Sequence, residues 1–147
     1  MTAMLRDMAD ALGLTIEYVN LATRDGEYRH DLNLIRLREG MTLRKERCTL
    51  AHELAHAVFA DVPSKFGPVN AKQERRADEW AAMRLIGLNQ YQAAEEQWSG
   101  NIGAMAFDLG VTTKIIRAYQ RVLERIGDTV YVGPRMGDGQ WIARVPA

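Results

Sequence analysis

The sequence predicts an α+β fold that is mainly helical, with a small β-sheet and a C-terminal β-hairpin. Segments with apolar residues at three- and four-residue spacing fill most of the chain between residues 42 and 126. Two short β-rich segments precede them, and a third β-rich region closes the chain. At 147 residues, 47% of them hydrophobic, the chain has the length and composition of one domain, residues 1–147, with its own core.

The first forty residues are expected to form one helix and two strands. Apolar residues at helical spacing predict a helix over residues 2–12, which Gly13 ends. The segments TIEYVNL (15–21) and DLNLIRL (31–37) have the composition of strands, so we expect them to pair as a small sheet.

The next part of the chain is expected to be helical. Thr42 can cap a long helix that runs to about Ala60. Asn70, with Gln73 three residues later, forms a capping box and predicts a helix over residues 71–86. Shorter helices are expected at 90–97, 102–109 and 112–126, with Gly110 between the last two.

The C-terminal segment 128–146 resembles a β-hairpin, because two β-rich runs flank the turn sequence PRMGDG. We find no internal repeat and no low-complexity segment.

Charge and cysteine content limit the classes of function. Lys plus Arg and Asp plus Glu both number 19, so no net charge attracts the chain to nucleic acid or to an anionic membrane. No segment approaches the ~20 apolar residues of a membrane-spanning helix. The one cysteine, Cys48, fits a reducing compartment, and the N-terminus lacks the apolar segment of a secretion signal. We expect a soluble cytoplasmic protein without membrane contact.

Two histidines and a glutamate interrupt the otherwise apolar segment CTLAHELAHAVFAD (48–61). Residues four apart share a helix face, so His52 and His56 can bind one ion. Glu53 lies about 100° around the helix from His52 and can reach a water at that ion without binding the ion. Zinc suits this H-E-x-x-H motif, because it is bound by neutral imidazole and lowers the pKa of a bound water to about 7. We predict one Zn2+ per chain, with Glu53 as the catalytic base.

The alternative is that these polar residues lie in the core by accident. Burying an imidazole or a carboxylate without a partner costs on the order of several kcal/mol, so each would need its own explanation. One metal ion accounts for all three.

A catalytic zinc site has a third protein ligand. Phe59 and Val62 occupy the Gly and His positions of the longer motif H-E-x-x-H-x-x-G-x-x-H, which excludes that class. The remaining candidates are acidic residues of the following helix: Glu74, Asp78 and Glu79.

Helical phase favours Glu74 as the ligand. Glu74 and Asp78 share a stripe with small and apolar residues, whereas Glu79 lies about 140° away from Glu74. Asp78 is expected to accept the second ring proton of His52 or His56. The alternative for Glu74 and Asp78 is a solvated face that pairs with basic neighbours.

Further residues have roles that the pattern leaves open. Cys48 faces the site and would make the zinc structural as a fourth ligand, although a core position is the usual role of such a cysteine. The donor to the oxyanion is one of Tyr28, His30, Arg117 and Tyr119. We also expect strand 32–37 to be a sheet edge to which an extended substrate adds.

The segments TLAHELAHAVFAD and ERRADEWAA are similar to the two motifs of the ImmA/IrrE family of metallopeptidases, H-E-L-x-H and E-x-x-A-[ND]-x-F-A. The resemblance spans about residues 28–120, and it implies a zincin-like, gluzincin-type metalloprotease fold with a core at residues 28–97. It also implies that His52, His56 and Glu74 bind zinc and that Glu53 is the base. Trp80 stands where the family usually has Phe, and RLIGL replaces the common LLMP. The resemblance further implies a phage or prophage protein that cleaves a helix-turn-helix repressor in the cytoplasm of a bacterial host.

Residues 101–126 resemble a helix-turn-helix, with Ala106, Gly110 and Ile116 at matching offsets. The second helix also carries an apolar core face, and no second basic element accompanies its basic residues Lys114, Arg117, Arg121 and Arg125. Direct DNA binding is therefore less favoured than docking of a repressor.

Together these patterns predict a zinc metalloendopeptidase that cleaves a transcriptional repressor. The alternative is a non-proteolytic zinc-containing regulator that binds a repressor or DNA by contact alone. A metal-free interaction module with a vestigial motif is a third hypothesis.

Overall fold

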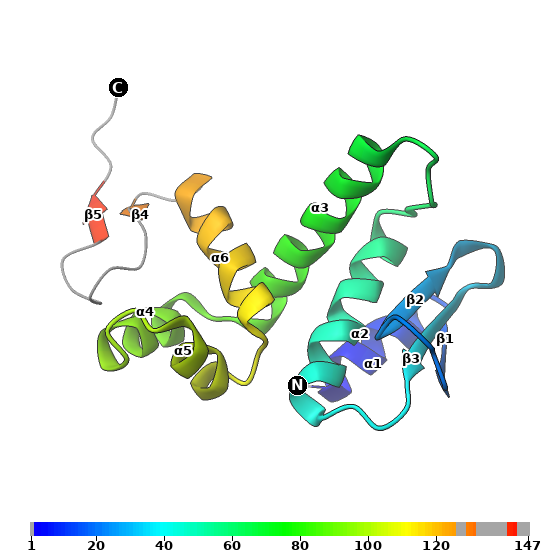
Figure 1. Ribbon diagram of the computed structural model, residues 1–147, viewed down its shortest axis with the longest axis horizontal. Coiled ribbons are helices and arrows are strands. Elements are labelled where there is room, and N and C mark those ends of the chain that lie inside the picture. Colours follow the sequence, from blue (N-terminus) through cyan, green and yellow to red (C-terminus); the bar gives the residue numbers. More distant parts are fainter. Residues whose placement is uncertain (1, 126–128, 132–140, 144–147) are drawn as a thin grey trace. The chain divides into compact units, whose positions relative to one another are not determined.

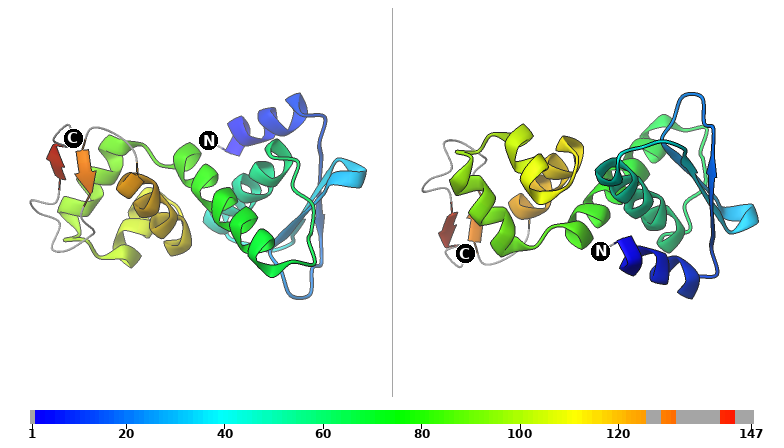
Figure 2. Two further views of the ribbon diagram at one scale, coloured as in Figure 1. Left: turned by 90° about the horizontal axis from the view of Figure 1, so that it is seen from above. Right: turned by 90° about the horizontal axis from the view of Figure 1, so that it is seen from below.

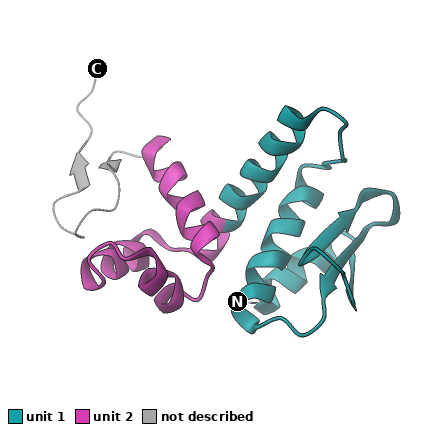
Figure 3. Cartoon of the chain, viewed as in Figure 1, with its two compact units in different colours: residues 1–81 teal, residues 82–147 magenta. Residues whose placement is uncertain are grey.

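The computed structural model describes residues 2–125 and the strand residues 129–131 and 141–143 (Figure 1). The chain divides into two compact units, residues 1–81 and residues 82–147 (Figure 3). The expectation that residues 1–147 behave as one domain stays a prediction. No helix among the described residues has the length and apolar character needed to cross a membrane.

Unit 1 combines a three-stranded sheet with helices. Helices α1 and α2 pack on one face of the sheet, since α2 contacts β2 and β3 while α1 contacts β1 and α2 (Figure 2). The elements are α1 (Thr2–Ala11), β1 (Thr15–Val19), β2 (Gly26–Arg29), a 3-10 turn (His30–Leu32), β3 (Leu34–Arg38), α2 (Leu43–Val58) and α3 (Gly67–Leu85), whose last residues belong to unit 2.

The sheet has the order β1-β3-β2. β3 runs parallel to β1 and antiparallel to β2, so the predicted pairing of the two β-rich segments is confirmed. The expectation that strand 32–37 is a sheet edge is wrong. β3 pairs on both sides because Leu34, Ile35 and Leu37 are buried and place it at the centre. The two edges of the sheet are β1 and β2, and β2 is a strand that the sequence pattern did not predict.

The ends of α2 follow from local chemistry. The Thr42 side chain accepts a hydrogen bond from the backbone N–H of Lys45 at 3.2 Å, as expected of the predicted cap. Leu50, Ala51, Leu54 and Ala55 are fully buried, so α2 forms the centre of the core of unit 1. The helix ends at Val58, close to the predicted end.

The start of α3 differs from the prediction. The helix begins at Gly67, and Pro68 follows as a residue whose fixed φ suits the first helical turn. Asn70 therefore lies inside the helix and does not form the predicted capping box. Its side-chain oxygen accepts a hydrogen bond from the backbone N–H of Ser64 at 2.8 Å, which fastens the preceding loop to α3.

Unit 2 contains the helices α4 (Leu88–Gln97), α5 (Ile102–Leu109) and α6 (Thr113–Arg125), which confirms the three predicted helices. Asn101 caps α5, and Gly110 ends it in a left-handed conformation with a φ of 67°. Strands β4 (Thr129–Tyr131) and β5 (Trp141–Ala143) pair antiparallel, as the predicted hairpin requires. The predicted turn PRMGDG lies outside the described residues.

The core face expected of α6 is present. Ile115, Ile116, Val122 and Leu123 are buried, whereas Lys114, Arg117 and Arg125 are exposed. The helix-turn-helix-like segment thus has a core role, and binding of DNA or of a repressor by it stays a prediction.

Candidate metal centre

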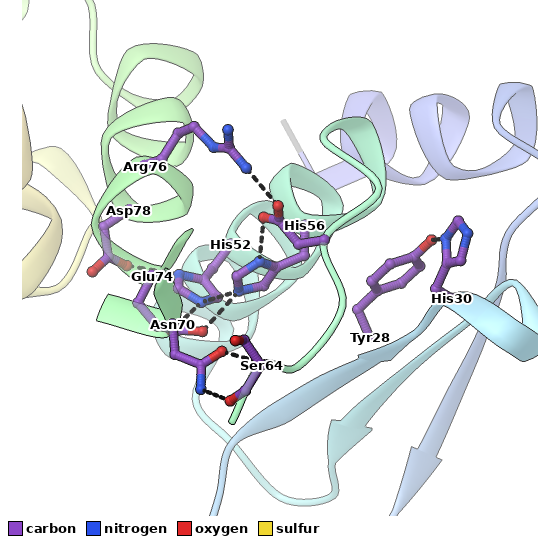
Figure 4. A network of polar contacts seen from close by, with 10 residues as sticks. Tyr28, His30, His52, His56, Ser64, Asn70, Glu74, Arg76 and Asp78 are labelled. Carbon is purple, nitrogen blue, oxygen red and sulfur yellow. Dashed lines mark hydrogen bonds and ion pairs between the residues drawn. The ribbon is translucent and has the colours of Figure 1, made fainter. Parts of the chain in front are cut away.

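Helix α2 presents His52 and His56 one turn apart on the same side (Figure 4). The Nε2 atoms of the two rings lie 3.0 Å apart, and the ring centroids lie 4.7 Å apart. Both side chains are largely buried, at 13% and 10% exposure. The two imidazole nitrogens therefore face one point.

Glu74 of α3 closes this arrangement. Its carboxylate oxygens lie 3.0 Å from the Nε2 atom of His52 and 3.0 Å from that of His56. One ligand atom from each of the three residues lies within 4.8 Å of the others. Two imidazole nitrogens and a carboxylate form the donor set of a catalytic zinc site, so the residues present fit that ion. Glu79, the rival by sequence, does not belong to this group.

A carboxylate holds each histidine through its second ring nitrogen. The Nδ1 atom of His52 lies 2.7 Å from Asp78 Oδ1, and the Nδ1 atom of His56 lies 2.9 Å from Asp61 Oδ2. With the proton on Nδ1, each ring keeps a lone pair on the Nε2 atom that faces Glu74. Asp78 occupies the place that helical phase predicted. Asp61 was not predicted, although it follows His56 by five residues.

The electrostatics of the cluster favour a positive charge. Burial lowers the pKa of His52, but its hydrogen bonds to Asp78 and Glu74 outweigh burial and raise that pKa to about 9. Burial also lowers the pKa of His56, but its hydrogen bonds to Glu74 and Asp61 outweigh burial, so that this pKa is raised as well. The hydrogen bonds to both histidines hold the pKa of Glu74 well below its usual range. The carboxylates that favour protonation of the two histidines would also stabilise a metal cation bound at their Nε2 atoms.

Glu53 lies beside this cluster and is 7% exposed. Burial raises its pKa, while the nearby His52 and His56 act in the opposite direction. A carboxylate with a raised pKa is a better proton acceptor than an exposed one, which suits a general base.

The cluster opens into a cavity of about 490 Å³. The residues of β2 form one wall and the motif residues of α2 form another. The remaining lining residues are Arg24, the loop residues Asp61, Val62 and Pro63, and Asn70, Gln73 and Glu74 of α3. The edge strand and the candidate metal ligands therefore share one cavity.

The four candidate oxyanion donors fall in different places. Tyr28 lines the cavity, and its hydroxyl lies 2.7 Å from the Nδ1 atom of His30. Arg117 and Tyr119 lie on α6 in unit 2, where Tyr119 makes an edge-on ring contact with Tyr91 at 5.0 Å. The fold of unit 1 thus places Tyr28 at the cavity and His30 beside the Tyr28 hydroxyl. Cys48 is buried and does not belong to the metal-ligand group.

Comparison with known proteins agrees with this geometry. Residues 9–118 match the family model Peptidase_M78, the IrrE N-terminal-like domain. The chain belongs to this family. The predicted resemblance to ImmA/IrrE metallopeptidases is therefore confirmed, and so is the α+β fold. No curated protein matches the sequence of this IrrE N-terminal-like domain.

A solved structure of a Mycobacterium tuberculosis transcriptional regulator shares the fold of this IrrE N-terminal-like domain, with a TM-score of 0.59 at 17% sequence identity. The likeness covers 86% of this chain and 44% of that chain. The chain thus spans less than half the length of the regulator. At this identity the comparison supports the fold alone.

Proposed function

We propose that the chain is a zinc-dependent endopeptidase in which His52, His56 and Glu74 hold one zinc ion. The convergence of two Nε2 atoms and a carboxylate within 4.8 Å supports this proposal most directly. Membership of a metallopeptidase family supports it independently.

The residues of the chain have separate tasks in peptide hydrolysis. A bound zinc ion supplies Lewis-acid chemistry, which polarises the peptide carbonyl and lowers the pKa of a water molecule. Glu53 accepts the proton of the attacking water on its carboxylate and returns it to the leaving amine. Asp78 holds the Nδ1 proton of His52, so that the Nε2 lone pair stays available. The hydroxyl of Tyr28 donates to the carbonyl oxygen as it becomes negative.

In this proposal the substrate peptide binds along strand β2. It is an edge of the sheet, and all four of its residues line the cavity beside Glu53. An extended peptide that pairs with a sheet edge gains main-chain hydrogen bonds and keeps a straight backbone. β2 thus replaces strand 32–37 as the proposed docking edge.

The proposed substrate is a transcriptional repressor of a phage or mobile element in the bacterial cytoplasm. The ImmA/IrrE family membership supports a protein substrate of this kind.

The test combines zinc content with turnover. We expect about one zinc per chain by native mass spectrometry, as for a three-ligand catalytic site. Glu74→Gln should weaken zinc binding clearly, whereas Glu79→Gln, the same change on the same helix, should not. Glu53→Gln should retain zinc and stop repressor cleavage, because the base is lost while the ligands remain.

Each outcome separates the hypotheses. A wild-type chain without zinc, even after zinc is added, would refute the metal site. The non-proteolytic regulator would be favoured by two results together: the zinc-loaded wild type does not cleave the repressor, and Glu53→Gln still binds it. Cleavage by Glu53→Gln at the wild-type rate would exclude Glu53 as the base.

A further inference from the structure

Asp61 lies in the loop between α2 and α3, and its carboxylate is held from two sides. Its Oδ2 atom accepts a hydrogen bond from the Nδ1–H of His56 at 2.9 Å. Its Oδ1 atom accepts a hydrogen bond from the guanidinium of Arg76, a residue of α3. The Asp61 side chain is only 6% exposed, so both contacts lie at a buried carboxylate.

The end of α2 explains how Asp61 reaches His56. Ala60 adopts a left-handed conformation with a φ of 52°. The Ala60 N–H donates to Ala57 O at 3.1 Å and the Asp61 N–H donates to His56 O at 2.9 Å, which is the Schellman pattern of a helix C-terminus. This turn brings the Asp61 side chain back to the ring of His56.

Arg76 is itself fixed in place. Its guanidinium carbon lies 4.0 Å from the centroid of the Phe59 ring, at the end of α2. A guanidinium cation over an aromatic face is attracted electrostatically to the ring. The Arg76 side chain is 43% exposed, yet its charge is directed at the buried carboxylate.

The two histidines are thus oriented by α3 in different ways. His52 is held directly by Asp78, which lies one turn after the ligand Glu74. His56 is held indirectly, because Asp61 comes from the loop and Arg76 connects it to α3. A hydrogen bond to the second ring nitrogen fixes the tautomer and the ring orientation of a metal-binding histidine.

We propose that Asp61 is the positioning residue of His56 and that Arg76 fixes Asp61, so that these three residues act as one unit. This inference rests on the proposed zinc site. In this unit the Asp61 carboxylate keeps the proton of His56 on Nδ1 and directs Nε2 toward Glu74. Arg76 prevents the loop carboxylate from rotating away.

The test measures zinc affinity by competition with a chelator in purified variants of the chain. Asp61→Ala should weaken zinc binding about ten- to a hundred-fold, the range known for such outer partners. Arg76→Gln should weaken it less, since the hydrogen bond between Asp61 and His56 remains. Adding Arg76→Gln to Asp61→Ala should cause no further loss, because residues of one unit are not additive. Arg75→Gln, at the exposed neighbouring position, should bind zinc as the wild type does.

A second readout separates positioning from mere structural support. Nitrogen-15 NMR of the histidine rings in the zinc-loaded protein should show His56 protonated on Nδ1 and bound through Nε2. In Asp61→Ala and Arg76→Gln the Nδ1–H signal of His56 should broaden or shift, while the Nδ1–H signal of His52 stays unchanged. Asp61→Asn, whose amide oxygen can still accept the hydrogen bond, should recover part of the affinity.

The inference is overturned if Asp61→Ala and Asp61→Asn bind zinc as tightly as the wild type with an unchanged His56 signal. Should Asp61→Ala fail to fold, Asp61→Asn and Arg76→Gln decide, and wild-type affinity in both overturns it. A wild-type chain that binds no zinc refutes the metal site itself, and this inference with it. Whether the wild type binds zinc therefore distinguishes failure of the proposed metal site from failure of the inference about Asp61 and Arg76.

Discussion

Tyr28 is the candidate oxyanion donor that lines the cavity of the metal centre. Burial and the negative charge of Asp61 raise the pKa of its phenol, so the hydroxyl keeps its proton and can donate. We expect Tyr28→Phe to lower the turnover number about 10²- to 10³-fold, the effect of losing one oxyanion donor. Zinc affinity should not change, because Tyr28 is not among the proposed ligands. Steady-state kinetics on a repressor substrate, with zinc content measured in parallel, checks this.

Tyr18→Phe is the matched control for that variant. Tyr18 lies on β1 and contacts Arg6 and Glu46, so its loss should affect stability and leave turnover near the wild-type value. Full turnover in Tyr28→Phe would exclude Tyr28 as the donor and leave His30, Arg117 and Tyr119 as candidates.

At the level of residues, the sequence predicts what regular helix geometry determines. His52 and His56 share a face, and Glu74 differs in phase from Glu79, because each residue adds a fixed rotation of about 100°. Asp61 could not be placed in this way. It follows Ala60, whose left-handed conformation ends the helical geometry, and an alanine in that position gives no sequence signal of the turn.

At the level of elements, β2 and α2 approach each other closely at Gly26. A Cβ atom at this position would lie 2.7 Å from the Thr49 Cγ2 atom and 3.2 Å from the Glu53 Cγ atom. We expect Gly26→Ala to destabilise the fold by about 1–3 kcal/mol, as overpacking does. It should also reduce turnover more than zinc affinity, because Glu53, the proposed base, must shift. Denaturant unfolding and kinetics provide the two measurements.

Thr49→Ser offers a rescue, because it removes the methyl group that the new Cβ meets and keeps the hydroxyl. The double variant should recover part of the stability lost in Gly26→Ala. Gly67→Ala is the control, since a Cβ there meets nothing within 4 Å and should cost no stability. An unaltered free energy of unfolding in Gly26→Ala would show that the strand and helix are not packed this closely.

Comparison of the predicted and observed elements shows which sequence signals were sufficient to predict where a helix or strand begins and ends. Helix α5 has the predicted bounds, because Asn101 caps its start and Gly110 ends it in a left-handed conformation. Strand β2 was missed since its four residues, GEYR, are all partly exposed and show no alternation. α3 was predicted to start too late because Asn70 suits a cap. The side chain of Asn70 instead bonds the loop at Ser64, a tertiary contact that local pattern does not encode.

At the level of the molecule, the proposed zinc ligands all belong to one of the two units. His52, His56 and Glu74 all lie in unit 1, whereas α4, α5 and α6 lie in unit 2. An ion that binds only the folded state stabilises it by about 4 kcal/mol at a thousandfold excess over the dissociation constant. This free energy is expected to act on the elements that supply the ligands.

We therefore expect zinc removal to act locally. When EDTA is added, amide hydrogen exchange should accelerate in peptides of residues 43–58 and 67–81, which contain α2 and the ligand-bearing part of α3. Peptides of residues 88–125 should change much less, because local opening free energies differ between cooperative units. Glu74→Gln should exchange like the EDTA-treated wild type and should not respond to EDTA. Equal acceleration in both units would mean that they unfold together, which would contradict a local effect and favour the single domain expected from the sequence.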